Sequence, residues 1–243
     1  MLNWYLRYRP IMSVLESSGA EDVLDVGSGW FGLSWYWPYR VIQTDIDFSG
    51  DRPREGDRAG QAVFVCSTAE KLPFANNSFD FALSSDMLEH LPEAVRAPSV
   101  AELTRVARRG VIVGFPTGSA RIVDLFFARL LRLRGHAPPA WLSEHLAQVS
   151  DPDRRTVEQA LPVGWEISGE YRNGNALFSA LVGLSEMWGA TAPMAAKAER
   201  RLRGRTLWPL ADARPVVRVI YLLMPVPSAA AVSGFLDHAS REA

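Results

Sequence analysis

The stretch VLDVGSGWFGLS, residues 23–34, holds residue types whose spacing can do chemistry. Its glycines Gly27, Gly29 and Gly32 follow the pattern GxGxxG, which lets a strand-to-helix turn bend sharply and approach a nucleotide-like ligand. Asp25 discriminates between ligands by charge. At about 6 Å and an effective dielectric constant near ~20, its carboxylate repels a pyrophosphate by roughly 3 kcal/mol and attracts an ammonium or sulfonium by a similar amount. The turn therefore favours S-adenosylmethionine over NAD.

Asp45 lies at the end of the next apolar run, in VIQTDID. We predict that its carboxylate accepts hydrogen bonds from both hydroxyls of a bound ribose. An acidic residue at this place suits NAD and S-adenosylmethionine alike, so Asp45 indicates a ribose and nothing narrower. The alternative is a carboxylate that caps a helix or a turn.

Histidines are the candidates for taking a proton from a methyl acceptor, because their pKa lies near working pH. His90 follows Asp86 by four residues, so a helix there would place both on one face and let Asp86 orient the base. His145 lies in the predicted helical segment at 117–160. For each histidine the alternative is a structural role, and alignment of the reactants alone can sustain methyl transfer. We predict no metal site.

Short apolar, β-branched runs predict the strands that position these residues. They cover 22–26, 40–44, 62–66, 79–84, 110–115, 164–172 and 215–226. Near-continuous apolarity is typical of parallel strands that are covered on both faces. A helix is predicted over 93–108, with arginines in its last turn and Gly110 just beyond. This alternation predicts a doubly wound α/β sheet.

The predicted organisation is one domain over residues 1–243. Within it we expect an N-terminal helical cover at 1–20, a cofactor-binding core at 22–116, helical insertions over the acceptor site at 117–160 and 173–214, and a loose tail at 228–243.

The composition narrows the class of protein. The formal net charge of −1 argues against a general nucleic-acid binder. A single cysteine, Cys66, excludes an internal disulfide and any thiolate-rich metal site, and it suits a reducing cytosol. Charged residues interrupt the first apolar stretch, so it is unlike a signal peptide. We therefore expect a cytoplasmic protein, and the oligomeric state stays open.

Residues 67–93, STAEKLPFANNSFDFALSSDMLEHLPE, carry a further pattern. Together with VLDVGSG they resemble class I S-adenosylmethionine-dependent methyltransferases, in the branch that includes quinone-biosynthesis enzymes. The matching positions are Leu72, Pro73, Phe74, Ser78, Phe79, Asp80, Leu88, His90 and Leu91. The resemblance spans residues 22–115. It implies a Rossmann-like, mostly parallel seven-stranded sheet with helices on both faces, one antiparallel strand and helical cap insertions.

The resemblance also implies roles in binding S-adenosylmethionine, which would leave as S-adenosylhomocysteine. Gly27 and Gly29 would pack against the methionine portion, and Asp25 would meet its ammonium through a water. The residues implied for the nucleoside and the sulfur are Asp45 for the ribose, Ile46, Thr68 and Ala69 beside the adenine, and Ser84 beneath the sulfur. Two positions depart from the family: Trp30 and Phe31 shift the third glycine by one place, and Thr68 replaces an aspartate.

These features predict methyl transfer to a small-molecule acceptor, with oxygen slightly preferred. The alternatives are a non-catalytic S-adenosylmethionine-binding protein and an NAD-dependent oxidoreductase. The segment 119–136 carries an apolar stripe of Ile122, Leu125, Phe126, Leu130 and Leu133. The main interpretation is a lid helix packed on the sheet. The other is an interfacial helix that makes weak contact with a membrane surface or a lipid-linked substrate.

Overall fold

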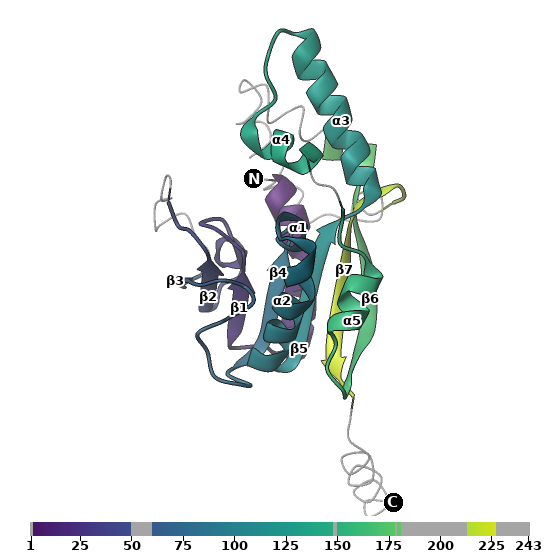
Figure 1. Cartoon of the computed structure of the whole chain (residues 1–243). Helices are drawn as coiled ribbons and strands as arrows, with labels where there is room; N and C mark the ends of the chain where they lie inside the picture. The colour runs from purple at the N-terminus through teal and green to yellow at the C-terminus, as the bar shows by residue number, and fades with distance from the viewer. Residues whose placement is uncertain (1, 50–59, 148–149, 178, 181–212, 227–243) are drawn as a thin grey trace, which may run out of the picture.

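A computed structural model describes residues 2–49, 60–147, 150–177, 179–180 and 213–226 (Figure 1). Seven strands form one sheet in the order β3-β2-β1-β4-β5-β7-β6. They are β1 Val23–Val26, β2 Val41–Asp45, β3 Ala62–Cys66, β4 Phe79–Ser85, β5 Ala107–Pro116, β6 Trp165–Asn175 and β7 Val216–Pro225. All pairings are parallel except those of β7, which runs antiparallel to β5 and β6. The α/β sheet and its antiparallel member are confirmed.

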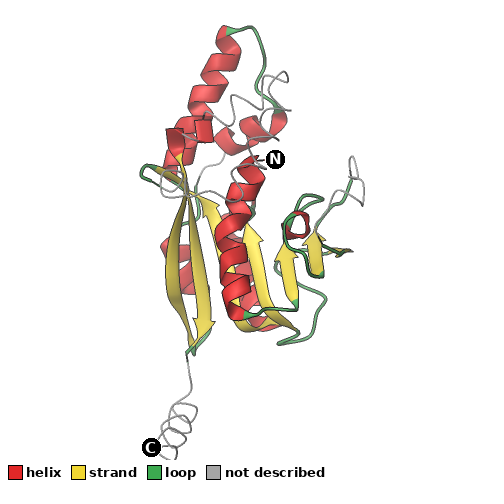
Figure 2. Ribbon diagram, turned by 180° about the vertical axis from the view of Figure 1, so that it is seen from behind, coloured by secondary structure: helices red, strands yellow, loops and turns green. Residues whose placement is uncertain are grey.

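Helices cover both faces of the sheet, and each face has its own apolar core (Figures 1 and 2). On one face α1 (Leu2–Ser18) packs Ile11 and Leu15 against a cluster that contains Phe81 and Ile112. On the other face α2 (Glu93–Val106) and α5 (Arg154–Ala160) pack against strand residues that include Phe115. Because β1 and β4 are buried along their whole length, their sequences are apolar with little alternation.

Two helices, α3 (Gly118–Leu133) and α4 (Ala140–Ala147), lie beyond the carboxyl end of β5 (Figure 1). The expected insertion at 117–160 is therefore divided, because α5 packs on the sheet beside α2 and does not join this cap. Residues 181–212 of the second expected insertion and the expected tail 228–243 lie outside the described residues. No helix in the described ranges is long and apolar enough to cross a membrane.

The chain between β1 and β2 departs most from the expected fold. The helix that should follow the glycine turn is a single 3-10 turn, η1 (Leu33–Trp35). Aromatic rings fill the space beside it: the Trp30 ring centroid lies 5.1 Å from that of Phe48 and 4.8 Å from that of Phe64. Trp35 and Trp37 are buried. These aromatic side chains therefore pack the segment between β1 and β2 against the neighbouring chain.

The chain leaves β6 and re-enters β7 at one point. The Ala176 N–H donates to the Pro215 carbonyl oxygen at 2.7 Å, and the Asn175 side-chain amide donates to the Ala213 carbonyl oxygen at 2.9 Å. These bonds close the base of the intervening segment.

Replacement of Gly32 by alanine should destabilise the fold. An added Cβ would lie 2.3 Å from Gln43 Nε2 and 2.7 Å from Asp25 Oδ2, both of which are buried. We expect Gly32→Ala to lower the free energy of unfolding in urea by about 1–3 kcal/mol. Gly118→Ala is the control, because a Cβ there meets no atom within 4 Å. Equal stability of the two variants would contradict this packing.

Candidate active site

The glycine turn is held against β2 and is open at one residue. The Gly27 and Ser28 N–H groups donate to the Thr44 carbonyl oxygen at 2.7 and 3.3 Å. Gly27 has φ +74° and lies beneath Met87, whose side chain would be 2.4 Å from a Cβ at Gly27. Gly29 has φ +53°, and a Cβ there would meet nothing within 4 Å. A ligand can therefore approach the backbone closely at Gly29.

Asp45 shapes the glycine turn from the end of β2. Its Oδ2 accepts a hydrogen bond from the Gly29 N–H at 2.8 Å and so helps to shape the turn. Among the described residues its Oδ1 accepts only a long contact of 3.4 Å, from the Asp47 N–H, which leaves lone pairs for a ligand hydroxyl. Ile46 beside it is exposed. This end of β2 therefore offers one carboxylate oxygen and one apolar side chain next to the open turn.

Asp25 lies beneath the turn and is fully buried. Its Oδ2 accepts hydrogen bonds from the Leu33 N–H at 2.7 Å and from the Tyr8 hydroxyl at 3.1 Å, which tie η1 and α1 to β1. Its Oδ1 has no hydrogen-bond partner among the described residues. Burial raises the pKa of Asp25 to about 7, against the opposing effect of these two hydrogen bonds. The water-mediated contact with an ammonium stays a prediction.

The other residues expected at the cofactor lie on the same edge of the sheet. Thr68 is exposed and Ala69 is buried, just after β3, whereas Ser84 is buried near the end of β4. The Ser84 hydroxyl has no partner within the part of the chain that is described. An open turn, a carboxylate with free lone pairs and an unpaired buried hydroxyl fit a nucleoside with a polar tail.

Asp86, directly after β4, is held in a left-handed conformation with φ +56°. Arg218 Nε donates to Asp86 Oδ1 at 2.6 Å, and a second Arg218 nitrogen contacts Oδ2. Arg7 also contacts Oδ2, at 2.8 Å. Burial raises the pKa of Asp86, but Arg218 and Arg7 outweigh it and hold this pKa below its usual value.

The expected helix that would pair Asp86 with His90 is corrected by the structure. The segment is a single 3-10 turn, η3 (Leu88–His90), and Asp86 precedes it. The carboxylate of Asp86 contacts two arginines, Arg7 and Arg218.

The structure brings His90 and His145 together. Their ring centroids lie 5.1 Å apart, although one follows β4 and the other lies on α4. His145 Nδ1 lies 3.3 Å from Asp124 Oδ2 on α3, so the carboxylate that orients a histidine is Asp124. Among the described residues no group of three or more His, Cys, Asp or Glu side chains could hold a metal ion.

Besides Asp124, the sequence did not predict three charged residues of this site. Glu89 is buried, and neither of its carboxylate oxygens has a hydrogen-bond partner in the described ranges. Burial, followed by the nearby charge of Asp86, raises the pKa of Glu89 to about 8. Arg7 and Arg218 hold Asp86. The sequence around Arg218 could have indicated this role. Arg218 is the one cation within the apolar strand VVRVIYLLMP, and a charge in a buried strand needs a buried partner.

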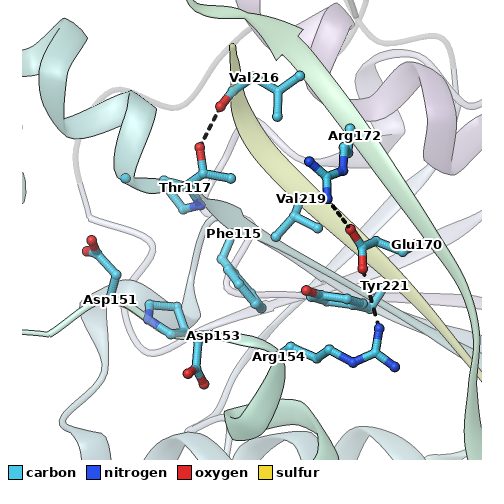
Figure 3. A pocket seen from close by; sticks show the side chains of 13 residues that line it. Phe115, Thr117, Asp151, Asp153, Arg154, Glu170, Arg172, Val216, Val219 and Tyr221 are labelled. Carbon is cyan, nitrogen blue, oxygen red and sulfur yellow. Dashed lines mark hydrogen bonds and ion pairs between the residues drawn. The ribbon is translucent and has the colours of Figure 1, made fainter. Parts of the chain in front are cut away.

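A separate cavity of about 380 Å³ lies near the start of α3 and α5 (Figure 3). Phe115, Val219 and Tyr221 line it, and Glu170 pairs at its rim with Arg172 and Arg154. Val219 and Tyr221 alternate along β7 with Arg218, so they point to the opposite face of the sheet. The cavity therefore lies across the sheet from the Asp86–Arg218 pair.

Comparisons with known proteins identify the class. Residues 24–115 match the family described as "Methyltransferase domain". An uncharacterized methyltransferase of Mycolicibacterium paratuberculosis is 27% identical over 211 residues, which are 84% of this chain and 73% of that protein. One from Mycobacterium avium is 33% identical over 103 residues, which are 39% of this chain and 38% of that protein.

A solved structure from work on the conversion of a disulfide bond into a thioacetal group during echinomycin biosynthesis has the same fold. It superimposes with a TM-score of 0.50 at 17% identity, over 96% of this chain and 87% of its own. Residues 24–115 thus match a methyltransferase domain, and the chain has the class I methyltransferase fold. It is an enzyme whose methyl donor is S-adenosylmethionine, which decides against NAD. The quinone-biosynthesis branch stays a prediction.

The buried Glu89 carboxyl should make stability depend on pH. A carboxyl whose pKa is raised by folding stabilises the fold below its ordinary pKa, and this contribution is lost as pH rises toward about 8. Glu89→Gln should therefore leave stability near pH 5 almost unchanged and raise the free energy of unfolding at about pH 8.5 by on the order of 1–3 kcal/mol. Thermal unfolding across this pH range measures it.

The control for this experiment is Glu93→Gln, an exposed carboxyl in the first turn of α2. It should change stability little at either pH. A Glu89→Gln variant that is less stable than the parent at alkaline pH would show that the ionised carboxylate has a stabilising partner.

Proposed function

We propose that the enzyme transfers the methyl group to a small-molecule acceptor, with oxygen preferred, at the carboxyl ends of β4 and β5 beneath α3 and α4. The observation that carries the proposal is the meeting of His90 and His145 at this edge, with His145 held by Asp124. A histidine fixed by a carboxylate is suited to remove the proton of a hydroxyl acceptor.

His145 is the better placed base of the two. When Asp124 accepts a hydrogen bond from Nδ1–H, the basic lone pair of the neutral ring lies on Nε2. S-adenosylmethionine supplies an electrophilic methyl group on a sulfonium. The chain's residues then have to align the acceptor oxygen with that methyl group and take the proton that the oxygen loses. His90, with its ring next to that of His145, contributes to the same side of the site.

We propose the cofactor contacts from the position of Gly29, where the glycine turn is open to a ligand. Gly29 would allow the methionine portion close to the backbone, with Gly27 beside it, and Asp45 Oδ1 would accept from the ribose. Ile46, Thr68 and Ala69 would border the adenine, Ser84 would lie beneath the sulfur, and Asp25 would act through a water. A small-molecule acceptor, and not a nucleic acid, also suits the formal net charge of −1.

Asp45→Asn tests the ribose contact. Asparagine keeps an oxygen for the Gly29 N–H but loses the negative charge and the second acceptor oxygen. We expect the Kd for S-adenosylmethionine to rise about 10- to 100-fold in isothermal titration. Asp47→Asn, an exposed carboxylate that contacts Ser49, is the matched control and should bind like the parent. An unchanged Kd for Asp45→Asn would remove Asp45 from the site.

His145→Gln tests the base. With a methyl-labelled donor and a panel of phenols, alcohols, amines and thiols, the parent should transfer label to an oxygen acceptor. The variant should lose about 100-fold or more in kcat while its Kd for the cofactor stays the same. Asp124→Asn should also lower kcat and change the pH profile. His136→Gln, an exposed histidine after α3, is the control.

The panel also separates the alternatives. Transfer to oxygen with full activity in His145→Gln would leave alignment as the only catalytic device. Transfer to nitrogen or sulfur alone would overturn the preference for oxygen. Tight cofactor binding without transfer to any member of the panel would overturn the proposed class of acceptor.

A further inference from the structure

Helix α3 has two apolar faces. Its inner face carries Phe127 and Ala128, which are buried in a small core with Leu142 of α4. Its outer face carries a second stripe, and the exposed fractions of these side chains are 69% for Ile122, 54% for Leu125, 50% for Phe126 and 77% for Leu133. The lid helix predicted to pack this stripe on the sheet is therefore wrong: α3 uses its other face to hold α4.

The outer face also carries positive charge. Arg129 and Arg132 are exposed on α3. Asp124 is the acidic residue of the helix, and it lies on the inner face, where it contacts His145. At helical spacing Arg129 lies within the apolar stripe, one turn from Phe126 and Leu133, and Arg132 lies along its border. Arg121 instead donates to the Leu146 carbonyl oxygen of α4 at 3.3 Å. A long arginine can keep its charge in water above a buried stem.

The position of α3 makes this face accessible. The helix starts at the carboxyl end of β5 and extends beyond the sheet, with α4 folded against its inner side (Figures 1 and 2). The four apolar side chains and the arginines thus lie together at one end of the molecule. An exposed stripe of large apolar residues bordered by arginines is the pattern of a helix that lies in the interface of an anionic bilayer.

We propose that the outer face of α3 docks on an anionic lipid bilayer. Ile122, Leu125, Phe126 and Leu133 enter the interface and the arginines meet lipid headgroups. The charge selects this occupant over a second copy of the chain, because two such faces would bring like charges together. Through Asp124, the inner face of the same helix holds His145. If the proposed function is right, the acceptor site then opens beside the lipid surface.

The test is co-sedimentation of the full chain with vesicles of phosphatidylcholine alone and of phosphatidylcholine with about 30 mol% phosphatidylglycerol. We expect the protein to pellet with the anionic vesicles only, and less so as salt rises. Phe126→Glu should weaken this binding at least about 10-fold, because a carboxylate replaces the apolar anchor and repels the surface. Tyr39→Glu is the matched control. Tyr39 is an aromatic residue that is 58% exposed, and it lies in the loop before β2, away from α3.

Cofactor titration of each variant shows that the fold is intact and separates the two proposals. Vesicle binding without any binding of S-adenosylmethionine would overturn the proposed function and leave docking standing. No binding to anionic vesicles, or equal binding of Phe126→Glu and the parent, would overturn docking. A dimer that Phe126→Glu abolishes, without vesicle binding, would assign the face to a second copy of the chain.

Discussion

The buried contact of Asp86 with Arg218 and Arg7 is the constraint on which the site depends. It joins the end of β4 to β7 and to α1, three elements far apart in sequence. Removal of one partner from a buried ion pair leaves an uncompensated charge and costs about 3–5 kcal/mol, so these elements keep their relative positions. Because η3 begins two residues later, the same contact fixes where Glu89 and His90 lie. The left-handed backbone at Asp86 is thus held by charge.

Side-chain hydrogen bonds fix the glycine turn, where a longer helix was expected to follow it. A helix N-terminus would offer backbone N–H groups and a dipole to a phosphate, but only the three-residue η1 follows this turn. Asp25 and Asp45 instead accept hydrogen bonds from Leu33 and Gly29, and Gln43 donates to the Ser28 hydroxyl at 2.9 Å. The Asp45 carboxylate beside the turn makes the site unfavourable for a pyrophosphate. The local fold and the charge argument therefore agree on a cationic methyl donor.

The sheet was predictable from the sequence because strands that are buried on both faces consist of nearly continuous apolar residues. All seven strands end within a few residues of their predicted ends. The missing first helix was not predictable, since its loss depends on how Trp30 packs with Phe48 and Phe64. The histidines were found by residue type alone. Their partners were not, because the contact of His145 with Asp124 joins two helices whose relative position is set by packing of Phe127 and Leu142. Nothing in the sequence indicated that Glu89 is buried, because its burial depends on how the elements pack in the folded protein.

The closed base between β6 and β7 has a consequence for how this fold can diversify. Ala176 and Pro215 share a hydrogen bond, so the chain departs from the sheet and returns to it at one point on the carboxyl edge. The register of β6 on β7 is fixed by their own ladder and not by the length of the segment between them. The chain between these two strands can consequently change in length or sequence without shifting the register of β6 on β7.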